Sequence, residues 1–290
     1  MSNLEQKVFV LTRNFRGVPG YDLVIRDPGA TVQDYLDALN AAIVRLPLRR
    51  NRRRGTQDCV GCDRCCAERA PLTIVDCLRL REALEKATEG KSAKGTGKEA
   101  GRGAGKWTGQ GTGGKPGGGT AERSGREAGI KTGGEGGREP AREIGEKCPE
   151  SWDAFFDRYT TVTVQGPVVD IVLKRNEDGR CIFLDRRTKL CRVYSARPFV
   201  CQTFICSPAA RRALELREAL VNKGEDELVR LWLTTGMVIH QAHHPRPDPR
   251  DWPPTPFAGK TRYGEVLLRE VLPGRIWQKL KANGGSWRRG

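Results

Sequence analysis

The sequence predicts an α+β fold, with a small antiparallel sheet and four or five helices. Two observations carry this prediction. Short runs in which apolar and polar residues alternate are typical of half-buried strands, and longer runs with apolar residues three or four apart are typical of helices. A third observation is a glycine-rich segment: 19 of the 35 glycines fall between Gly90 and Pro140. That segment interrupts the pattern and divides the chain.

The N-terminal part predicts two strands followed by a helix. The strands are "KVFVLTR" and "YDLVIR" within residues 7–26, and the turn-rich "NFRGVPG" joins them. The helix begins at Thr31 in "TVQDYLDALNAAIVRL". Asp34 follows three positions later, as in a capping box. Pro47 and a run of arginines end this helix.

A second helix is expected in "PLTIVDCLRLREALEKA", with Thr73 as N-cap and Asp76 at the third position. Cys77 falls on its apolar face. Because an unpaired cysteine behaves as a small buried hydrophobe, we interpret Cys77 as a core residue.

The segment 90–140 reads as a disordered, mildly basic insertion. Its composition, as in "GTGKEAGRGAGKWTGQGTGGKPGGGT", cannot bury enough apolar surface to offset the entropy of ordering. The matches to nucleotide-binding glycine motifs inside it carry no weight, since no strand precedes them and no helix follows.

Beyond the insertion, "PESWDAFFDRYT" predicts a short helix, and "TVTVQG" with "VVDIVLKR" predicts a hairpin. A tighter hairpin is expected from "RCIFLD" and "LCRVY", with one cysteine on each arm. Two amphipathic helices follow, "SPAARRALELREALV" and "EDELVRLWLTTGMVIH". A last helix-like stretch around "GEVLLREVL" is interrupted by Pro273.

The net charge and the N-terminal sequence indicate which partners and which cellular location to expect. Fifty-one Lys and Arg against 35 Asp and Glu give a formal charge of +16, with a dense run from Arg49 to Arg54. This run suggests an acidic partner or a nucleic acid, or else a solvated face. No stretch is apolar enough for a signal peptide or a membrane helix, so we expect a cytoplasmic location, where thiols stay reduced.

Four cysteines crowd into "CVGCDRCC": Cys59, Cys62, Cys65 and Cys66. The CxxC spacing lets two thiolates face one metal ion. CxxCxxC is also the spacing by which bacterial ferredoxins give three thiolates to one cubane cluster. Cys65 and Cys66 are adjacent, so their side chains diverge. We therefore expect this group to supply only half of the ligands of one or two metal sites, with the other half coming from elsewhere in the chain.

A second group contains Cys181, Cys191, Cys201 and Cys206. The 114 residues between Cys66 and Cys181 are mostly helix and insertion, so the two groups can meet in space. All-sulfur ligation suits either zinc or an iron–sulfur cluster, and the CxxCxxC spacing favours a [4Fe–4S] cubane. Arg64, Arg69 and the run Arg49 to Arg54 would balance the negative charge of such a centre.

Other candidate ligands have simpler interpretations. Cys148 precedes Pro149 at the edge of the insertion, and we interpret it as a spare thiol. His240, His243 and His244 are interpreted as surface residues. No nucleophile, base and orienting acid can be named, so catalytic residues stay unknown and any enzymatic role depends on the metal.

These motifs carry a family resemblance. "CVGCDRCC" followed by "GRCIFLDRRTKLCRVYSARPFVCQTF" resembles the CxxCxxCC (YkgJ-type) cysteine cluster family of zinc- or iron-chelating proteins. The pattern of that family is CxxCxxCC, Cx(F/Y)L, Cx(I/V)Y and RPxxC with a following aromatic residue. The matching positions of the last three motifs are Cys181 with Phe183 and Leu184, Cys191 with Val193 and Tyr194, and Arg197, Pro198, Cys201 and Phe204.

The resemblance implies metal chelation and leaves the reaction open. Some flagellin lysine methylases are similar in their cysteine-rich part, so a metal-dependent protein-modifying enzyme is the alternative. The chain departs from the family pattern in its long insertion and in Gln202, where an arginine is usual. Cys77 and Cys148 are additional to the pattern.

The expected architecture places the sheet and the helices around a cysteine-ligated metal centre. We expect four segments: an N-terminal strand-strand-helix segment (1–50), a cysteine cluster metal-binding domain (51–89 and 141–210), the disordered insertion (90–140) and a C-terminal helical region (211–290). The expected ligands are the eight cysteines of the two groups.

Overall fold

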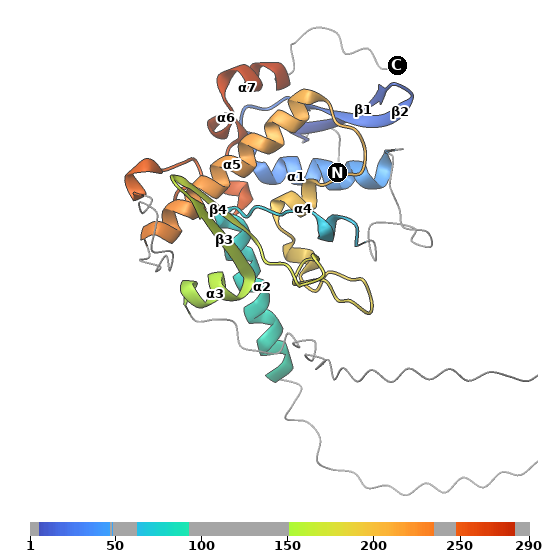
Figure 1. Cartoon of the computed structure of the whole chain (residues 1–290). Coiled ribbons are helices and arrows are strands. Elements are labelled where there is room, and N and C mark those ends of the chain that lie inside the picture. Colours follow the sequence, from blue (N-terminus) through green and yellow to red (C-terminus); the bar gives the residue numbers. More distant parts are fainter. Residues whose placement is uncertain (1–5, 47, 49–62, 93–150, 235–247, 282–290) are drawn as a thin grey trace, which may run out of the picture.

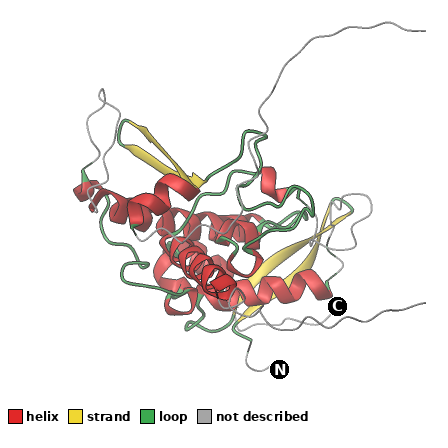
Figure 2. Ribbon diagram, turned by 90° about the horizontal axis from the view of Figure 1, so that it is seen from below, coloured by secondary structure: helices red, strands yellow, loops and turns green. Residues whose placement is uncertain are grey.

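The computed structural model of the chain describes residues 6–46, 48, 63–92, 151–234 and 248–281 (Figure 1). Within these ranges lie seven α-helices, four short 3-10 helices and two antiparallel hairpins. The α+β class is therefore confirmed. The expectation of a single small sheet was wrong, because the strands form two separate two-stranded sheets. Figure 2 shows these hairpins apart from each other, with helices between them.

The N-terminal hairpin pairs β1 (Val8–Phe15) with β2 (Val18–Ile25). Both residues of the connecting turn have positive φ, 53° at Arg16 and 85° at Gly17, which suits the right-handed twist of a two-residue hairpin. β2 also bonds to the segment just before residue 211, where a long helix begins: the Tyr21 N–H donates to the Pro208 carbonyl at 2.9 Å. The predicted strands are confirmed and run slightly longer.

Helix α1 (Val32–Arg45) begins as the sequence indicates. The Thr31 hydroxyl accepts a hydrogen bond from the Asp34 N–H, and the Asp34 carboxylate accepts one from the Thr31 N–H. This reciprocal capping box satisfies two of the free N–H groups at the helix start. The buried face of α1 includes Tyr35, Leu36 and Leu39.

Helix α2 (Ile74–Ser92) starts with the same arrangement. The Asp76 N–H donates to the Thr73 hydroxyl at 3.1 Å, and the Thr73 N–H donates to the Asp76 carboxylate at 3.0 Å. Cys77 is fully buried in the apolar core, so its interpretation as a core residue is confirmed. The helix extends to Ser92 and so includes the first residues of the expected insertion, whose remaining residues, 93–140, lie outside the described residues.

The second hairpin follows helix α3 (Trp152–Tyr159) and pairs β3 (Thr160–Gln165) with β4 (Val168–Leu173). Helix and hairpin are both confirmed. The segment just behind the first cysteine group lies along β4: the Leu72 N–H donates to the Ile171 carbonyl at 3.0 Å, and the Leu173 N–H donates to the Ala70 carbonyl at 2.9 Å. The hairpin thus holds the chain that leaves Cys66.

Helix α5 (Arg211–Thr234) is one continuous helix, so the prediction of two helices was wrong. The expected break between the two helices fell at residues 222–224, which include Gly224. The structure uses this glycine for close packing, because a Cβ there would lie 2.5 Å from the Thr73 side chain. Figure 1 shows α5 running between the two hairpins. It contacts β2 and β4, and the Glu225 carboxylate accepts a hydrogen bond from the Ile171 N–H.

The C-terminal region contributes short helices: η3 (Pro249–Asp251), η4 (Tyr263–Glu265), α6 (Leu268–Val271) and α7 (Gly274–Leu280). As expected, Pro273 interrupts the helical stretch, and it becomes the N-cap of α7. One apolar core joins the N-terminal, cysteine-rich and C-terminal segments, and the predicted domain boundaries stay a prediction. Among the described helices, none combines the length and apolar character needed to cross a lipid bilayer.

Candidate metal centre

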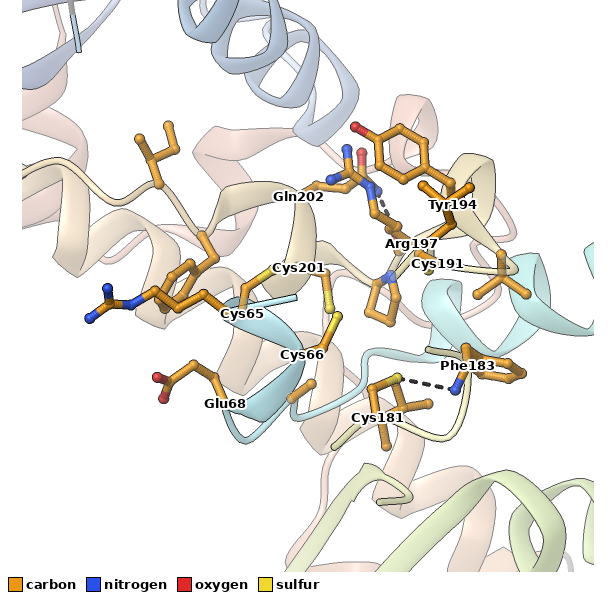
Figure 3. A pocket seen from close by; sticks show the side chains of 18 of the residues that line it. Cys65, Cys66, Glu68, Cys181, Phe183, Cys191, Tyr194, Arg197, Cys201 and Gln202 are labelled. Carbon is orange, nitrogen blue, oxygen red and sulfur yellow. Dashed lines mark hydrogen bonds between the residues drawn. The ribbon is translucent and has the colours of Figure 1, made fainter. Parts of the chain in front are cut away.

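Six cysteines from three separate segments line one cavity of about 660 Å³. Figure 3 shows five of them, arriving from η1 (Cys65–Ala67), from the loop after β4 and from α4 (Phe199–Thr203). All six are partly buried free thiols. The cysteines that the structure places together are Cys65, Cys66, Cys181, Cys191, Cys201 and Cys206. Members of the two sequence groups therefore meet in space, across the 114 residues that separate them.

The two groups are joined directly by backbone and side-chain contacts. The Cys181 N–H donates to the Cys66 carbonyl at 2.8 Å. Beside this bond, the nearly buried Asp63 carboxylate forms an ion pair with Arg180 at 2.7 Å and lies 3.7 Å from the Lys189 ammonium group. Because a buried carboxylate is costly without partners, these contacts fix the two groups relative to each other.

The loop between Cys181 and Cys191 is held by isolated bridges. Leu184 pairs with Cys191, and Arg175 pairs with Cys181, each in antiparallel fashion. The predicted tight hairpin here was wrong in detail, since these bridges replace regular strands. The Phe183 N–H donates to the Cys181 sulfur at 3.4 Å. An N–H aimed at sulfur stabilises the thiolate form, which is the form that binds metals.

Burial and mutual proximity raise the pKa of most of these thiols. Burial raises the pKa of Cys181 to about 11 and also raises the pKa values of Cys191 and Cys201. The charges of Cys65 and Cys191 act in the same direction on Cys181, because neighbouring thiolates repel each other. A bound cation would reverse this balance, since metal ligation requires thiolates and releases their protons.

The pKa of Cys65 shifts in the opposite direction. A hydrogen bond with the Cys66 side chain lowers the pKa of Cys65 to about 7, and the Arg197 charge acts in the same direction. The same hydrogen bond, together with burial, raises the pKa of Cys66. Within this adjacent pair, Cys65 is therefore the first thiol to lose its proton and the first that can ligate.

Positive charge surrounds the cavity. Among the described lining residues, Arg64, Arg175, Lys189 and Arg197 oppose the single carboxylate of Glu68. The Arg197 guanidinium lies 4.0 Å from the centroid of the Tyr194 ring. Its charge helps to lower the pKa of Cys65 and partly opposes the rise that burial causes in the pKa of Cys191. Four thiolates around a divalent ion carry a net charge near −2, which such a lining would balance.

The sequence located only part of this positive charge. Arg64 lines the cavity as expected, whereas Arg69 forms an ion pair with Asp170 of β4 instead. The run Arg49 to Arg54 lies outside the described residues. Arg175 and Lys189 were missed, because they stand six residues before Cys181 and two before Cys191, where no motif marks them. Arg197 could have been found, since it belongs to the RPxxC motif.

Apolar side chains form the mouth of the cavity. Five large hydrophobic side chains are exposed in the described part of the chain, and three of them line this cavity. They are Val44 at 80% exposure, Tyr194 at 44% and Leu190 at 43%. A metal ion or a small cluster needs much less than the cavity volume of about 660 Å³, so the mouth leaves room for a further group.

The remaining candidate ligands are not placed. Cys59, Cys62 and Cys148 lie outside the described residues, as do His240, His243 and His244. In the described ranges, no three His, Cys, Asp or Glu side chains stand close enough to hold a metal ion. The donor chemistry nevertheless fits zinc or iron, since both accept thiolate ligands. The cavity gathers these donors without arranging a closed coordination shell.

Comparison with known proteins agrees with this chemistry. Residues 142–223 match the family model CxxCxxCC, whose description is "Putative zinc- or iron-chelating domain". The matched range contains Cys181, Cys191, Cys201 and Cys206, while the first cysteine group precedes it. No curated protein and no solved structure matches the chain. The resemblance seen in the sequence is thereby confirmed, since residues 142–223 are similar to the CxxCxxCC family over that range.

Proposed function

We propose that this protein binds a [4Fe–4S] cluster or zinc through both cysteine groups, in a structural, redox or metal-handling role. The proposed ligands come from Cys59, Cys62, Cys65, Cys66, Cys181, Cys191, Cys201 and Cys206. The observation that supports this proposal is the presence of six of these thiols around one cavity. The thiolate-supporting N–H of Phe183 and the cationic lining agree with it.

The chemistry that a bound metal can supply depends on how many of its coordination positions are filled by cysteine. If cysteines fill every position, the bound metal or cluster supplies structure or electron transfer, and if one position stays open it supplies Lewis-acid chemistry. The protein itself contributes thiolate ligands, the positive charge of Arg197 and burial from water. The cubane takes precedence in this proposal because CxxCxxC supplies three thiolates from one loop.

Anaerobic purification of the full chain, with elemental analysis and a visible spectrum, tests this proposal. A brown protein with about four irons per chain is the result expected for a cubane. A colourless protein with one or two zinc ions would replace the cubane by zinc. A chain purified without either metal, and unable to take up either when reconstituted, would contradict the proposal.

Cys201 and Cys77 offer a matched pair of variants for the same measurement. Both are partly or fully buried helical cysteines, but only Cys201 lines the cavity. Cys201→Ala should lower the metal content per chain by at least half. Cys77→Ala should leave it unchanged, because that side chain lies in the apolar core. Equal metal loss in both variants would point to misfolding instead of lost ligation.

A second candidate function is a metal-dependent enzyme that modifies a polypeptide, such as a lysine methyltransferase. The exposed apolar side chains of Val44, Leu190 and Tyr194 favour it, because a substrate segment could rest against them beside the metal. Calorimetric titration with S-adenosylmethionine separates the two functions. Saturable binding at one site per chain would favour the enzyme, and the absence of any binding would remove this methyltransferase.

A further inference from the structure

A fully buried polar cluster lies at the start of α2, outside the cysteine cavity. The Tyr263 hydroxyl donates to the Asp76 carboxylate at 2.6 Å and lies 2.7 Å from the Thr73 hydroxyl. None of these three side chains is more than 1% exposed. Gly224 of α5 packs against Thr73 so closely that a Cβ would not fit. Residues from three distant parts of the chain therefore meet at the start of α2, around Thr73 and Asp76.

Asp76 also caps the helix that carries Cys201. Its carboxylate accepts a hydrogen bond from the Phe199 N–H at 2.7 Å, at the first residue of α4. The N-cap of α4 is Pro198, which makes no side-chain capping bond. Asp76 thus supplies from α2 the acceptor that a serine or aspartate usually supplies locally. Cys201 follows Phe199 by two residues.

One turn further along α2, Arg79 holds the other end of the same loop. Its guanidinium donates to the Ser195 carbonyl at 3.0 Å and lies 5.6 Å from the centroid of the Tyr263 ring. Ser195 belongs to η2 (Tyr194–Ala196), which follows Cys191. Two side chains of α2 therefore fix a loop that has a cysteine of the cavity on each side.

The cluster goes beyond what the capping of α2 requires. Thr73 and Asp76 alone complete the capping box. The bonds from Tyr263 and from the Phe199 N–H bring in the C-terminal region and the cysteine-bearing helix. A buried polar network in which every member is paired specifies one arrangement of the backbone, because any other arrangement leaves a buried polar group without a partner.

We propose that Asp76 and Tyr263 are positioning residues for the metal centre, which hold the segment between Cys191 and Cys201 in the geometry that binds the metal. This inference rests on the proposed metal-binding function. It makes the C-terminal region part of the metal-binding unit, although that region has no cysteine. Neither side chain touches the metal in this role, since Asp76 acts through the backbone of α4 and Tyr263 acts through Asp76 and the Phe199 ring.

Tyr263→Phe tests the role with the least disturbance, because it removes one hydroxyl and keeps the ring that packs against Phe199. Zinc affinity is measured on metal-free, reduced full-length protein by competition with a chromophoric chelator. We expect affinity to fall by about 10-fold, at the lower end of the effects of residues that support metal ligands. Asp76→Asn should weaken binding at least as much.

Glu227→Gln is the matched control. Glu227 is also a nearly buried carboxylate: it pairs with Arg230 within α5 and ties α5 to the C-terminal region by accepting a hydrogen bond from the Thr255 N–H. In the described part of the chain, these hydrogen bonds do not involve the cysteine segment. We expect a loss of thermal stability similar to that of Asp76→Asn, with zinc affinity within about twofold of the wild type, since additivity holds for distant sites.

Alkylation of the metal-free proteins gives a readout that does not depend on metal. Iodoacetamide labelling, followed by mass spectrometry of the Cys201 and Cys65 peptides, should show several-fold faster labelling of Cys201 in Tyr263→Phe and Asp76→Asn. Labelling of Cys65 should not change. The positioning role is overturned if both variants match Glu227→Gln in zinc affinity and in the labelling of Cys201. A wild-type chain that binds neither zinc nor iron would instead overturn the proposed function, and the labelling rates would still decide whether Asp76 and Tyr263 position Cys201.

Discussion

The apolar core around α2 and α5 and the wall of the cysteine cavity are built in different ways. The core consists of long helices whose buried faces interlock, and Cys77 lies in it as an ordinary apolar side chain. Much of the cavity wall consists of 3-10 turns, isolated bridges and the five-residue helix α4. The core can be stable through packing alone, whereas the cavity wall gathers thiols that repel each other once ionised. Regular packing supports the first region, and the proposed metal supports the second.

Metal removal should produce the largest difference between the two regions. Structural zinc contributes about 10 to 16 kcal/mol in small zinc domains, so stripping the metal should loosen the cavity wall. Hydrogen exchange before and after treatment with a chelator would measure this. We expect residues 180–206 to lose protection and α2 and α5 to keep theirs. An unchanged exchange pattern with an unchanged melting temperature would contradict the prediction.

Leu80→Ala tests the core side of the comparison. Leu80 is fully buried on α2, and its truncation should lower the free energy of unfolding by about 2 to 5 kcal/mol through lost contacts and a residual cavity. Urea unfolding would measure this loss. The metal content of the folded fraction should stay at the wild-type value. A parallel loss of metal would show that core and cavity wall are one cooperative unit.

Gly224→Ala tests how tightly α2 and α5 approach each other. The new Cβ would lie 2.5 Å from the Thr73 side chain, and overpacking of this kind costs about 1 to 3 kcal/mol. Alanine gains about 1 kcal/mol of helix propensity over glycine. We therefore expect a net destabilisation of up to about 2 kcal/mol by thermal unfolding.

Gly274→Ala is the control for this substitution. Gly274 begins α7 and has open space where a Cβ would stand. Stability should stay the same or increase slightly there. If both alanines had the same effect, close packing at Gly224 would not be the cause.

Glu225→Gln should give the smallest effect, and only at high pH. Burial raises the pKa of Glu225 to about 8, and a hydrogen bond with Asp170 acts in the same direction, while the Arg69 charge opposes both. The folded state thus holds a proton that the unfolded state releases near pH 4.5. This stabilisation is complete below about pH 4.5 and is lost as the pH rises toward 8.

Because glutamine stays neutral, Glu225→Gln should match the wild type at pH 4 and exceed its stability by about 1 kcal/mol at pH 9. The figure is small because the carboxyl group is partly exposed and therefore screened. Urea unfolding at both pH values would measure it. Equal stability of the two proteins at pH 9 would show that Glu225 ionises without cost beside Asp170.

Local signals in the sequence predicted most of the elements in the core. Thr31 with Asp34 and Thr73 with Asp76 marked the starts of α1 and α2, because a capping box depends only on residues three apart. Alternation of apolar residues marked the hairpin of β3 and β4 in the same way. The break expected at residues 222–224 was wrong, because Gly224 allows close packing on Thr73, a contact that no local stretch of sequence contains.

The sequence predicted which cysteines come together in the cavity, but not the other residues that line the cavity or hold the cysteines in place. The CxxCxxCC motif and the family pattern marked five of the six thiols that line it, and Cys206 was included only as a member of the second cysteine group. Spacing could not reveal Arg175 and Lys189, nor the capping of α4 by Asp76. These features depend on which segments meet after folding. The sequence therefore located the donors but not the residues that hold them.

The hydrogen bond from the Cys181 N–H to the Cys66 carbonyl has a consequence for how the protein is made. Its two ends are separated by 114 residues, and ribosomes add about 5 to 20 residues per second. The first cysteine group therefore leaves the ribosome roughly 6 to 23 seconds before its counterpart. During each round of translation, its thiols are therefore exposed to metals and oxidants before the cavity that gathers them has formed.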